Sequence, residues 1–167
     1  SRSIDVPPSV TVPTKSMVRT AITNALMDEL RGAEVLDLFA GSGALGFESL
    51  SRGAKHCVFV DSSKEAIGVI RKNAATLKET NCDILFMDYQ MALDKFKTPF
   101  DIIYLDPPYR MKEVYENVPS LILEKGLLKD HGVIVLEYEG EITVHKEQFS
   151  FSKEYSYGRT HVIILRK

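Results

Sequence analysis

The chain contains 167 residues, 44% of them hydrophobic and 26% charged, and carries a formal net charge of -2. This length suits one domain and is too short for a cofactor domain plus a separate substrate domain, which counts against a two-domain dehydrogenase. The charge excludes a wholly basic nucleic-acid-binding surface but allows a local basic face. Because no apolar run approaches the ~20 residues of a membrane span and the first residues lack a signal-peptide core, we expect a cytoplasmic protein outside the membrane.

The first predicted element is a helix near the N-terminus. Residues 1–13, with their prolines, indicate an extended lead-in, and the helix follows over residues 14–30. Thr14 or Ser16 is expected to cap it. The apolar residues expected on its buried face are Met17, Ile22, Ala25, Leu26 and Leu30.

From residue 34 onward, short apolar runs alternate with helical patterns. Strands are expected at residues 34–39, 56–61, 82–88, 100–106 and 132–139, with helices at 43–53, 63–79, 89–96 and 117–125. Residues 149–167 predict two further strands joined by a tight turn near Gly158. Helical spacers of this length imply right-handed crossovers between parallel strands.

The predicted fold class is therefore α/β. We expect a doubly wound, Rossmann-like sheet of seven strands, mostly parallel with a C-terminal antiparallel hairpin, plus the N-terminal helix. Residues 1–167 are expected to form a single domain, with an extension and helix at residues 1–31 and the catalytic sheet at residues 34–167.

The two cysteines give no sign of a disulfide or a metal site. Cys57 and Cys82 fall in predicted strands without C-x-x-C spacing, and the histidines do not cluster. This pattern opposes a disulfide framework and a zinc site. We expect both cysteines to be reduced and buried, and we expect no metal.

A glycine-rich turn follows the first predicted strand. Gly41, Gly43 and Gly46 have the spacing G-x-G-x-x-G, at the sheet edge where open α/β folds bind ligands. Backbone N–H groups in such a turn approach the pyrophosphate of a dinucleotide or the carboxylate of a methionine moiety. The turn alone therefore does not identify the cofactor.

Acidic residues at the ends of the predicted strands favour one cofactor. Asp61 suits ribose hydroxyls in either class, and Asp88 is able to accept a hydrogen bond from an adenine amino group. Asp37, beside the turn, would repel a pyrophosphate but attract the ammonium of a methionine moiety. Single acids at strand ends are often helix caps. Together with Asp106, however, these acids favour S-adenosyl-L-methionine over NAD.

The sequence Asp-Pro-Pro-Tyr, residues 106–109, follows the fourth strand. Pro107 and Pro108 stiffen the loop, so we expect the Asp106 carboxylate and the Pro107 carbonyl to face a ligand, with the Tyr109 ring beside them. Acceptors that hold the protons of an exocyclic amine aim its lone pair at a methyl donor. A carboxylate accepts from both N1–H and the N2 amine of guanine, whereas adenine presents a donor beside an acceptor. Guanine is therefore the better fit.

The chain resembles the bacterial methyltransferases that modify the N2 amine of a guanine in small-subunit (16S) ribosomal RNA. The resemblance is carried by residues 12–26, 35–54, 58–73, 100–109 and 124–139. Val12 stands where the family usually has an arginine, and the family's basic N-terminal segment is absent or short. The resemblance implies that the cofactor loop consists of Asp37, Gly41, Ser42 and Gly43, that Asp61 binds the ribose and that Asp88 binds the adenine. It also implies that the target amine is contacted by Asp106, Pro107, Pro108 and Tyr109.

RNA contacts are expected from basic residues near the predicted site. These are Lys15, Arg19, Arg110 and Lys112, with Arg159 as a further candidate. Scattered basic residues usually form only a solvated face. Because the net charge is weak, we expect poor binding of naked RNA. The expected substrate is ribosomal RNA in a small-subunit particle, and the expected enzyme is a monomer.

Other functions share parts of this pattern. A DNA adenine or protein glutamine N-methyltransferase uses a similar loop, although Asp106 and the lack of a target-recognition domain oppose it. A nicotinamide oxidoreductase is opposed by Asp37. A non-catalytic RNA-binding or ribosome-assembly module would retain only a cofactor pocket.

Overall fold

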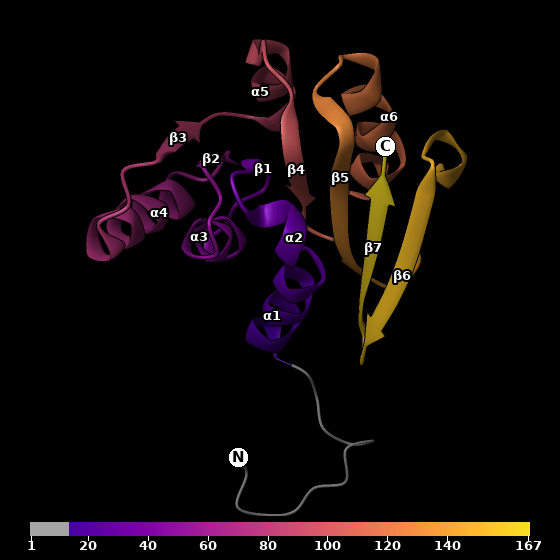
Figure 1. The fold of residues 1–167 in the computed structure, drawn as a ribbon, viewed down its shortest axis with the longest axis horizontal. Coiled ribbons are helices and arrows are strands. Elements are labelled where there is room, and N and C mark those ends of the chain that lie inside the picture. The colour runs from indigo at the N-terminus through magenta and orange to yellow at the C-terminus, as the bar shows by residue number, and fades with distance from the viewer. Residues whose placement is uncertain (1–13) are drawn as a thin grey trace, which may run out of the picture.

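The computed structural model describes residues 14–167 as one mixed sheet with helices on both faces (Figure 1). The strands lie in the order β3 (Cys82–Phe86), β2 (His56–Asp61), β1 (Glu34–Asp37), β4 (Phe100–Leu105), β5 (Leu128–Glu139), β7 (Thr160–Arg166) and β6 (Phe151–Tyr157). β1 to β5 are parallel, whereas β7 is antiparallel to β5 and β6. The predicted doubly wound sheet with a C-terminal hairpin is confirmed. The expected lead-in and Val12 lie outside the described residues.

Helices cover both faces of the sheet because each presents an apolar stripe to it. One face is packed by α1 (Lys15–Ala25), α2 (Met27–Leu30), α3 (Ala44–Ser51) and α4 (Lys64–Leu77). The opposite face is packed by α5 (Tyr89–Lys95) and α6 (Lys112–Glu124). The central strands β1 and β4 are therefore apolar toward both layers, as a parallel sheet covered twice requires.

The N-terminal helix differs in detail from the prediction. Thr14 caps it, since its Oγ1 accepts a hydrogen bond from the Met17 N–H at 3.1 Å, but the helix is interrupted at Leu26. Met17 is 54% exposed and Ala25 is also exposed, so placing them on the buried face was wrong. The buried row has a spacing of four and consists of Val18, Ile22, Leu26 and Leu30.

Several element boundaries also differ from the prediction, among them those of α6, β5 and β3. α6 begins at Lys112 rather than near residue 117, because the Met111 N–H bonds to the Pro108 carbonyl and turns the chain directly into the helix. β5 begins at Leu128, four residues early, and an irregular register after Phe100 accommodates its polar start. β3 ends at Phe86, before the predicted residue 88.

Cys57 is buried in β2, whereas Cys82 is only partly buried because β3 is an edge strand. The expectation of burial was therefore wrong for Cys82. Within residues 14–167, no set of His, Cys, Asp or Glu side chains is grouped so as to hold a metal ion. In the same range, no helix has the length and apolar character needed to cross a membrane.

Candidate active site

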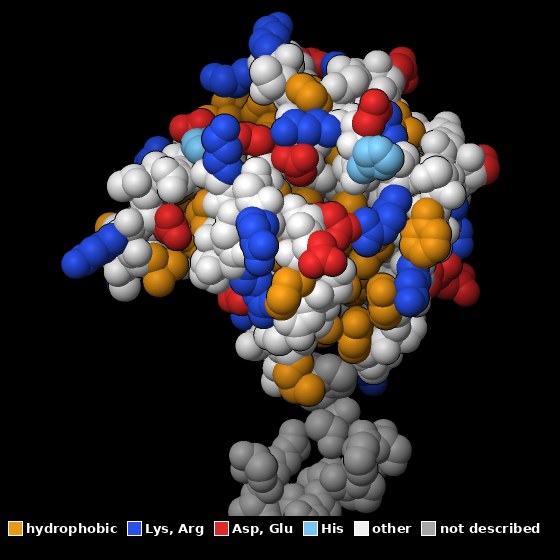
Figure 2. Space-filling view, in the orientation of Figure 1, with side chains coloured by type: hydrophobic (Ala, Val, Ile, Leu, Met, Phe, Trp, Pro, Cys, Tyr) orange, Lys and Arg blue, Asp and Glu red, His pale blue; other side chains and the backbone are white. Residues whose placement is uncertain are grey.

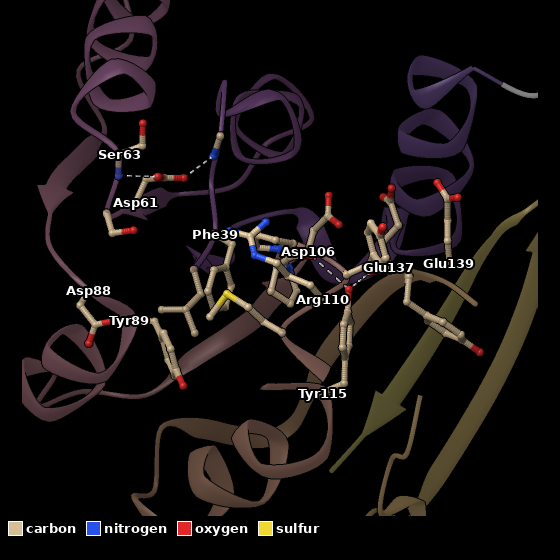
Figure 3. Close-up of a pocket in the computed structure, with 18 of the residues that line it drawn as sticks. Phe39, Asp61, Ser63, Asp88, Tyr89, Asp106, Arg110, Tyr115, Glu137 and Glu139 are labelled. Carbon is tan, nitrogen blue, oxygen red and sulfur yellow. Dashed lines mark hydrogen bonds between the residues drawn. The ribbon is translucent and has the colours of Figure 1, made fainter. Parts of the chain in front are cut away.

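The carboxyl ends of the parallel strands border a cavity of about 580 Å³ (Figure 3). Its walls come from the glycine turn, from the loops after β2, β3 and β4, and from the end of β5. A cavity of about 200 Å³ adjoins it and shares Lys15, Phe39, Gly41, Asp106 and Glu137 with it. The two are lobes of one cleft, which we name the larger lobe and the smaller lobe.

Each glycine of the G-x-G-x-x-G sequence is required at its position for a physical reason. Gly41 and Gly43 have φ of +58° and +82°, a region that residues with a Cβ rarely adopt. Gly46 lies within α3, where an added Cβ would be 2.3 Å from Cε1 of Phe59 on β2. The turn and the close packing of α3 on β2 therefore both require glycine.

Asp61 ends β2 and is held by two backbone donors. Its Oδ2 accepts from the Gly41 N–H at 2.9 Å, and its Oδ1 accepts from the Ser63 N–H at 2.8 Å (Figure 3). A carboxylate oxygen has two lone pairs, so both oxygens remain able to accept from a ligand in the larger lobe. Asp61 is thus a fixed acceptor next to the glycine turn.

Asp37 ends β1 and borders the smaller lobe, with only 2% of its surface exposed. Burial raises the pKa of Asp37 to about 7, and the Asp61 charge adds to this, while a hydrogen bond from the Gly46 N–H at 3.1 Å opposes it. A cation entering the smaller lobe would favour the ionised carboxylate. Asp37 is therefore the acceptor in this lobe that suits an ammonium group.

Asp106, directly after β4, and Glu137, on β5, are neighbours. The register of β4 and β5 pairs Leu105 with Leu136, so the next residue on each strand lies side by side at the sheet edge (Figure 3). Glu137 is 7% exposed, and its Oε2 lies 3.7 Å from Nζ of Lys15. Burial, followed by the charge of Glu137, raises the pKa of Asp106 to about 7, whereas Lys15 opposes this shift.

The loop of residues 106–109, which we name the proline loop, presents Tyr109 to solvent. Tyr109 is 68% exposed, and Pro108 is exposed too, whereas Pro107 is buried. The Pro107 carbonyl, expected to face a ligand, lies 3.3 Å from the Tyr115 hydroxyl and is the weaker of its two acceptors. The single proton of this hydroxyl is directed mainly to the nearer Glu137 carbonyl, at 2.7 Å, and this shared hydrogen bond ties the loop to β5.

Asp88 lies across the larger lobe from the proline loop. Its Oδ2 accepts from the Gln90 N–H at 3.0 Å and caps α5, so the carboxylate has a structural partner as well as access to the lobe. The rings of Phe39 and Tyr89, 5.2 Å apart between centroids, form an apolar wall beside it. This wall and the carboxylate match the flat apolar faces and polar edge of a purine.

The structure brings only part of the predicted basic set to the cleft. Lys15 and Arg19 lie on α1 and line the smaller lobe beside the acids, and Arg110 lines the larger lobe. Lys112 lines neither lobe, and Arg159 lies in the turn between β6 and β7. Lys15 therefore faces Glu137 and does not belong to a separate basic surface.

Glu137 is the main residue that the sequence patterns did not single out. Its signal is an acid directly after the apolar run from Val133 to Leu136. A buried acid in such a strand requires a partner, and the position at the strand end marks the ligand-binding edge. Phe39, Tyr89 and Tyr115 were also missed, because aromatic residues after strands are common in packing.

The strand order, with an inserted antiparallel β7, and the glycine turn define a Rossmann-like methyltransferase fold. The family model described as conserved hypothetical protein 95 matches residues 1–166, and the chain belongs to this family. It is 36% identical to the Escherichia coli ribosomal RNA small subunit methyltransferase D over 141 residues, which cover 84% of this chain and 71% of that relative.

Two solved structures share the fold. A conserved hypothetical protein from Streptococcus pyogenes has a TM-score of 0.81 and 32% identity, over 89% of this chain and 94% of that chain. The Thermus thermophilus 16S rRNA N2 methyltransferase RsmC, solved with AdoMet and guanosine, has a TM-score of 0.75 and 23% identity. That match covers 95% of this chain and 44% of the other, and at this identity it concerns the fold alone.

Proposed function

We propose that this chain transfers a methyl group from S-adenosyl-L-methionine to the exocyclic N2 amine of a guanine in small-subunit (16S) ribosomal RNA. The observation that carries the proposal is the Asp106 carboxylate, which lies beside Glu137 on a stiff loop at the junction of both lobes. Membership in a family that includes a ribosomal RNA methyltransferase supports the RNA class.

The residues present fit S-adenosyl-L-methionine. Asp37 would pair with its ammonium in the smaller lobe, with Gly41, Ser42 and Gly43 contributing the turn around its methionine part. Asp61 would accept from the ribose hydroxyls, and Asp88 from the adenine amino group beside the aromatic wall. When bound, the cofactor supplies an electrophilic methyl group on a sulfonium.

The protein's part in methyl transfer is positioning and charge. Asp106 would accept hydrogen bonds from the guanine amine, so that the nitrogen lone pair points at the methyl carbon as the carbon–sulfur bond breaks. The nitrogen then loses one proton to a carboxylate acceptor, for which Asp106 is placed. Pro107 and Pro108 hold this acceptor, and the exposed Tyr109 ring would stack on the extruded base.

A methyl-transfer assay tests this function. The wild-type chain is incubated with labelled cofactor and small-subunit particles, free ribosomal RNA, DNA or protein, and the product nucleoside is identified. We expect N2-methylguanosine from the particle, and less from free RNA because the net charge of -2 gives weak attraction for naked phosphates. Methylated adenine or methylated glutamine as the product would show that the substrate class proposed here is wrong. The absence of any methyl transfer would indicate a non-catalytic module.

Asp61→Ala is expected to weaken the binding of S-adenosylhomocysteine by roughly tenfold, because a charged acceptor is lost. The chain should remain folded, since Asp61 bonds only to the exposed N–H groups of Gly41 and Ser63, which water is able to satisfy. Calorimetric titration measures the affinity. Asp83→Ala on the edge strand β3, outside both lobes, is the matched control and should bind normally. Equal affinity in the two variants would contradict the ribose assignment.

The rate of methyl transfer is expected to rise with pH through about pH 7. The raised pKa of Asp106 means that acid protonates this acceptor, so its charge is present only on the alkaline side. Besides Glu137, the groups facing it are Lys15, which lowers its pKa, and Asp37 and Glu139, which raise it. Glu137→Gln removes the strongest neighbouring charge and should shift the midpoint to lower pH.

Single-turnover rates at saturating cofactor, over about pH 5.5 to 8.5, measure this midpoint without the contribution of cofactor binding. Glu139→Gln is the control, since Glu139 is exposed and, of the charges near Asp106, raises its pKa least. The midpoint should move less in this control than in Glu137→Gln. A flat profile in the wild type would contradict the role of Asp106.

A further inference from the structure

The outer strand β6 carries two different faces. Because successive side chains alternate, Phe151, Lys153, Tyr155 and Tyr157 share one face, and Ser152, Glu154 and Ser156 share the other. The first face lies on the same side of the sheet as α1, since its tyrosines pack against that side's core. We call this first face the aromatic face of β6.

The rings on the aromatic face are stacked and accessible. Tyr155 and Tyr157 stack with 17° between their planes and 6.4 Å between centroids, and Nζ of Lys153 lies 5.2 Å from the Tyr155 centroid. Phe151 is 49% exposed, while the two tyrosines are half-buried. Apolar and basic side chains also gather over β6 in the space-filling view (Figure 2). Exposed aromatic groups of this kind mark a contact surface.

Lys153 is the one charged side chain on this face of β6. Glu154 points to the opposite face, where it pairs with Lys146 at 2.7 Å, so it does not neutralise Lys153. The β6–β7 turn adds Arg159, which is exposed. Aromatic faces beside cations are the combination with which proteins bind single-stranded nucleic acid, through base stacking and phosphate contacts.

The aromatic face also connects with the cleft. Tyr157 pairs in register with Thr160, and Thr160 pairs with Glu139 on β5. Thr160 and Glu139 both line the larger lobe. If the target base occupies that lobe, the RNA strand that continues out of the lobe would therefore meet the Tyr157 end of β6. Extrusion of a base also unstacks its neighbours, which leaves them free to stack on protein rings.

We propose that the aromatic face of β6 binds the single-stranded nucleotides that adjoin the target base in the substrate RNA. Tyr155 and Tyr157 would provide the stacking surfaces, and Lys153 a phosphate contact. This inference rests on the proposed function, because it takes RNA as the substrate of the same cleft.

Direct binding tests the inference separately from catalysis. The probe is a fluorescein-labelled single-stranded RNA of about ten nucleotides, titrated at low salt and followed by anisotropy. The double variant Tyr155→Leu with Tyr157→Leu keeps apolar packing but removes the rings, and should bind roughly tenfold more weakly. Lys153→Gln should lower the slope of log affinity against log salt by about one. Phe86→Leu, an exposed aromatic on the opposite sheet edge, is the control and should bind normally.

The same variants are then assayed on small-subunit particles, where KM should rise in parallel while kcat and cofactor affinity stay unchanged. RNA affinity equal to wild type in variants with an unchanged melting temperature overturns the inference. If the double leucine variant does not fold, an unchanged salt slope in Lys153→Gln overturns it. A wild-type dimer that these substitutions dissociate, with unaltered RNA affinity, assigns the face to self-association instead. If the aromatic face of β6 binds RNA but the chain transfers no methyl group, the proposed function is overturned and the inference about this face stands.

Discussion

Asp106→Ala is expected to slow methyl transfer by about 10²- to 10³-fold while leaving the affinity for S-adenosylhomocysteine close to wild type. Asp106 lies beyond β4, next to Glu137 and away from the Asp61 and Asp88 side of the larger lobe (Figure 3). Its acceptor oxygens would act on the amine as the nitrogen becomes pyramidal. The lost interaction therefore belongs mainly to the transition state.

The measurement pairs single-turnover methylation with calorimetric cofactor binding on the same samples. Asp106→Asn should retain part of the rate because one oxygen acceptor remains, although its amide is able to turn a donor toward guanine N1–H. Asp101→Asn is the matched control, since Asp101 lies at the other end of β4 and accepts from the Glu34 N–H and from Lys129. A rate loss in Asp106→Ala that only mirrors weaker cofactor binding would refute the assignment.

The sheet was predictable because its strands are short apolar runs that end in acids or glycine turns. Asp37, Asp61 and Asp106 each follow such a run, and parallel strands bring their carboxyl ends to one edge. The structure places all three residues around the cleft for this reason. Strand ends and left-handed turns depend on the local sequence, and they could therefore be predicted from the sequence alone.

The contacts that Asp106 and Glu137 make within the cleft were not predictable in this way. Glu137 meets Asp106 only because β4 and β5 pair Leu105 with Leu136, and this register depends on an irregular start to β5. Lys15 meets Glu137 only because α1 packs on this side of the sheet. Both are tertiary relations between residues more than thirty positions apart, which periodicity along one segment does not contain.

Gly46→Ala is expected to destabilise the folded chain by about 3 kcal/mol. The added Cβ would lie 2.3 Å from Cε1 of Phe59 and 2.7 Å from Sγ of Cys57. Phe59 is fully buried and packs on Phe47 with 4.6 Å between ring centroids, so neither ring has space to retreat. The gain in helix propensity, about 1 kcal/mol, is too small to offset this overlap.

Gly68→Ala provides the matched control on another helix. Gly68 lies in α4, is exposed and has no atom within 4 Å of an added Cβ, so the same substitution should stabilise the chain by about 0.5 to 1 kcal/mol. Urea unfolding of both variants measures the change in the free energy of unfolding, which should have opposite signs in the two. Gly46→Ala should in addition weaken cofactor binding, because α3 would move away from β2 and carry the Gly46 N–H away from Asp37. Equal urea midpoints for the two variants would show that α3 is free to shift on β2 and that the third glycine is not required for packing.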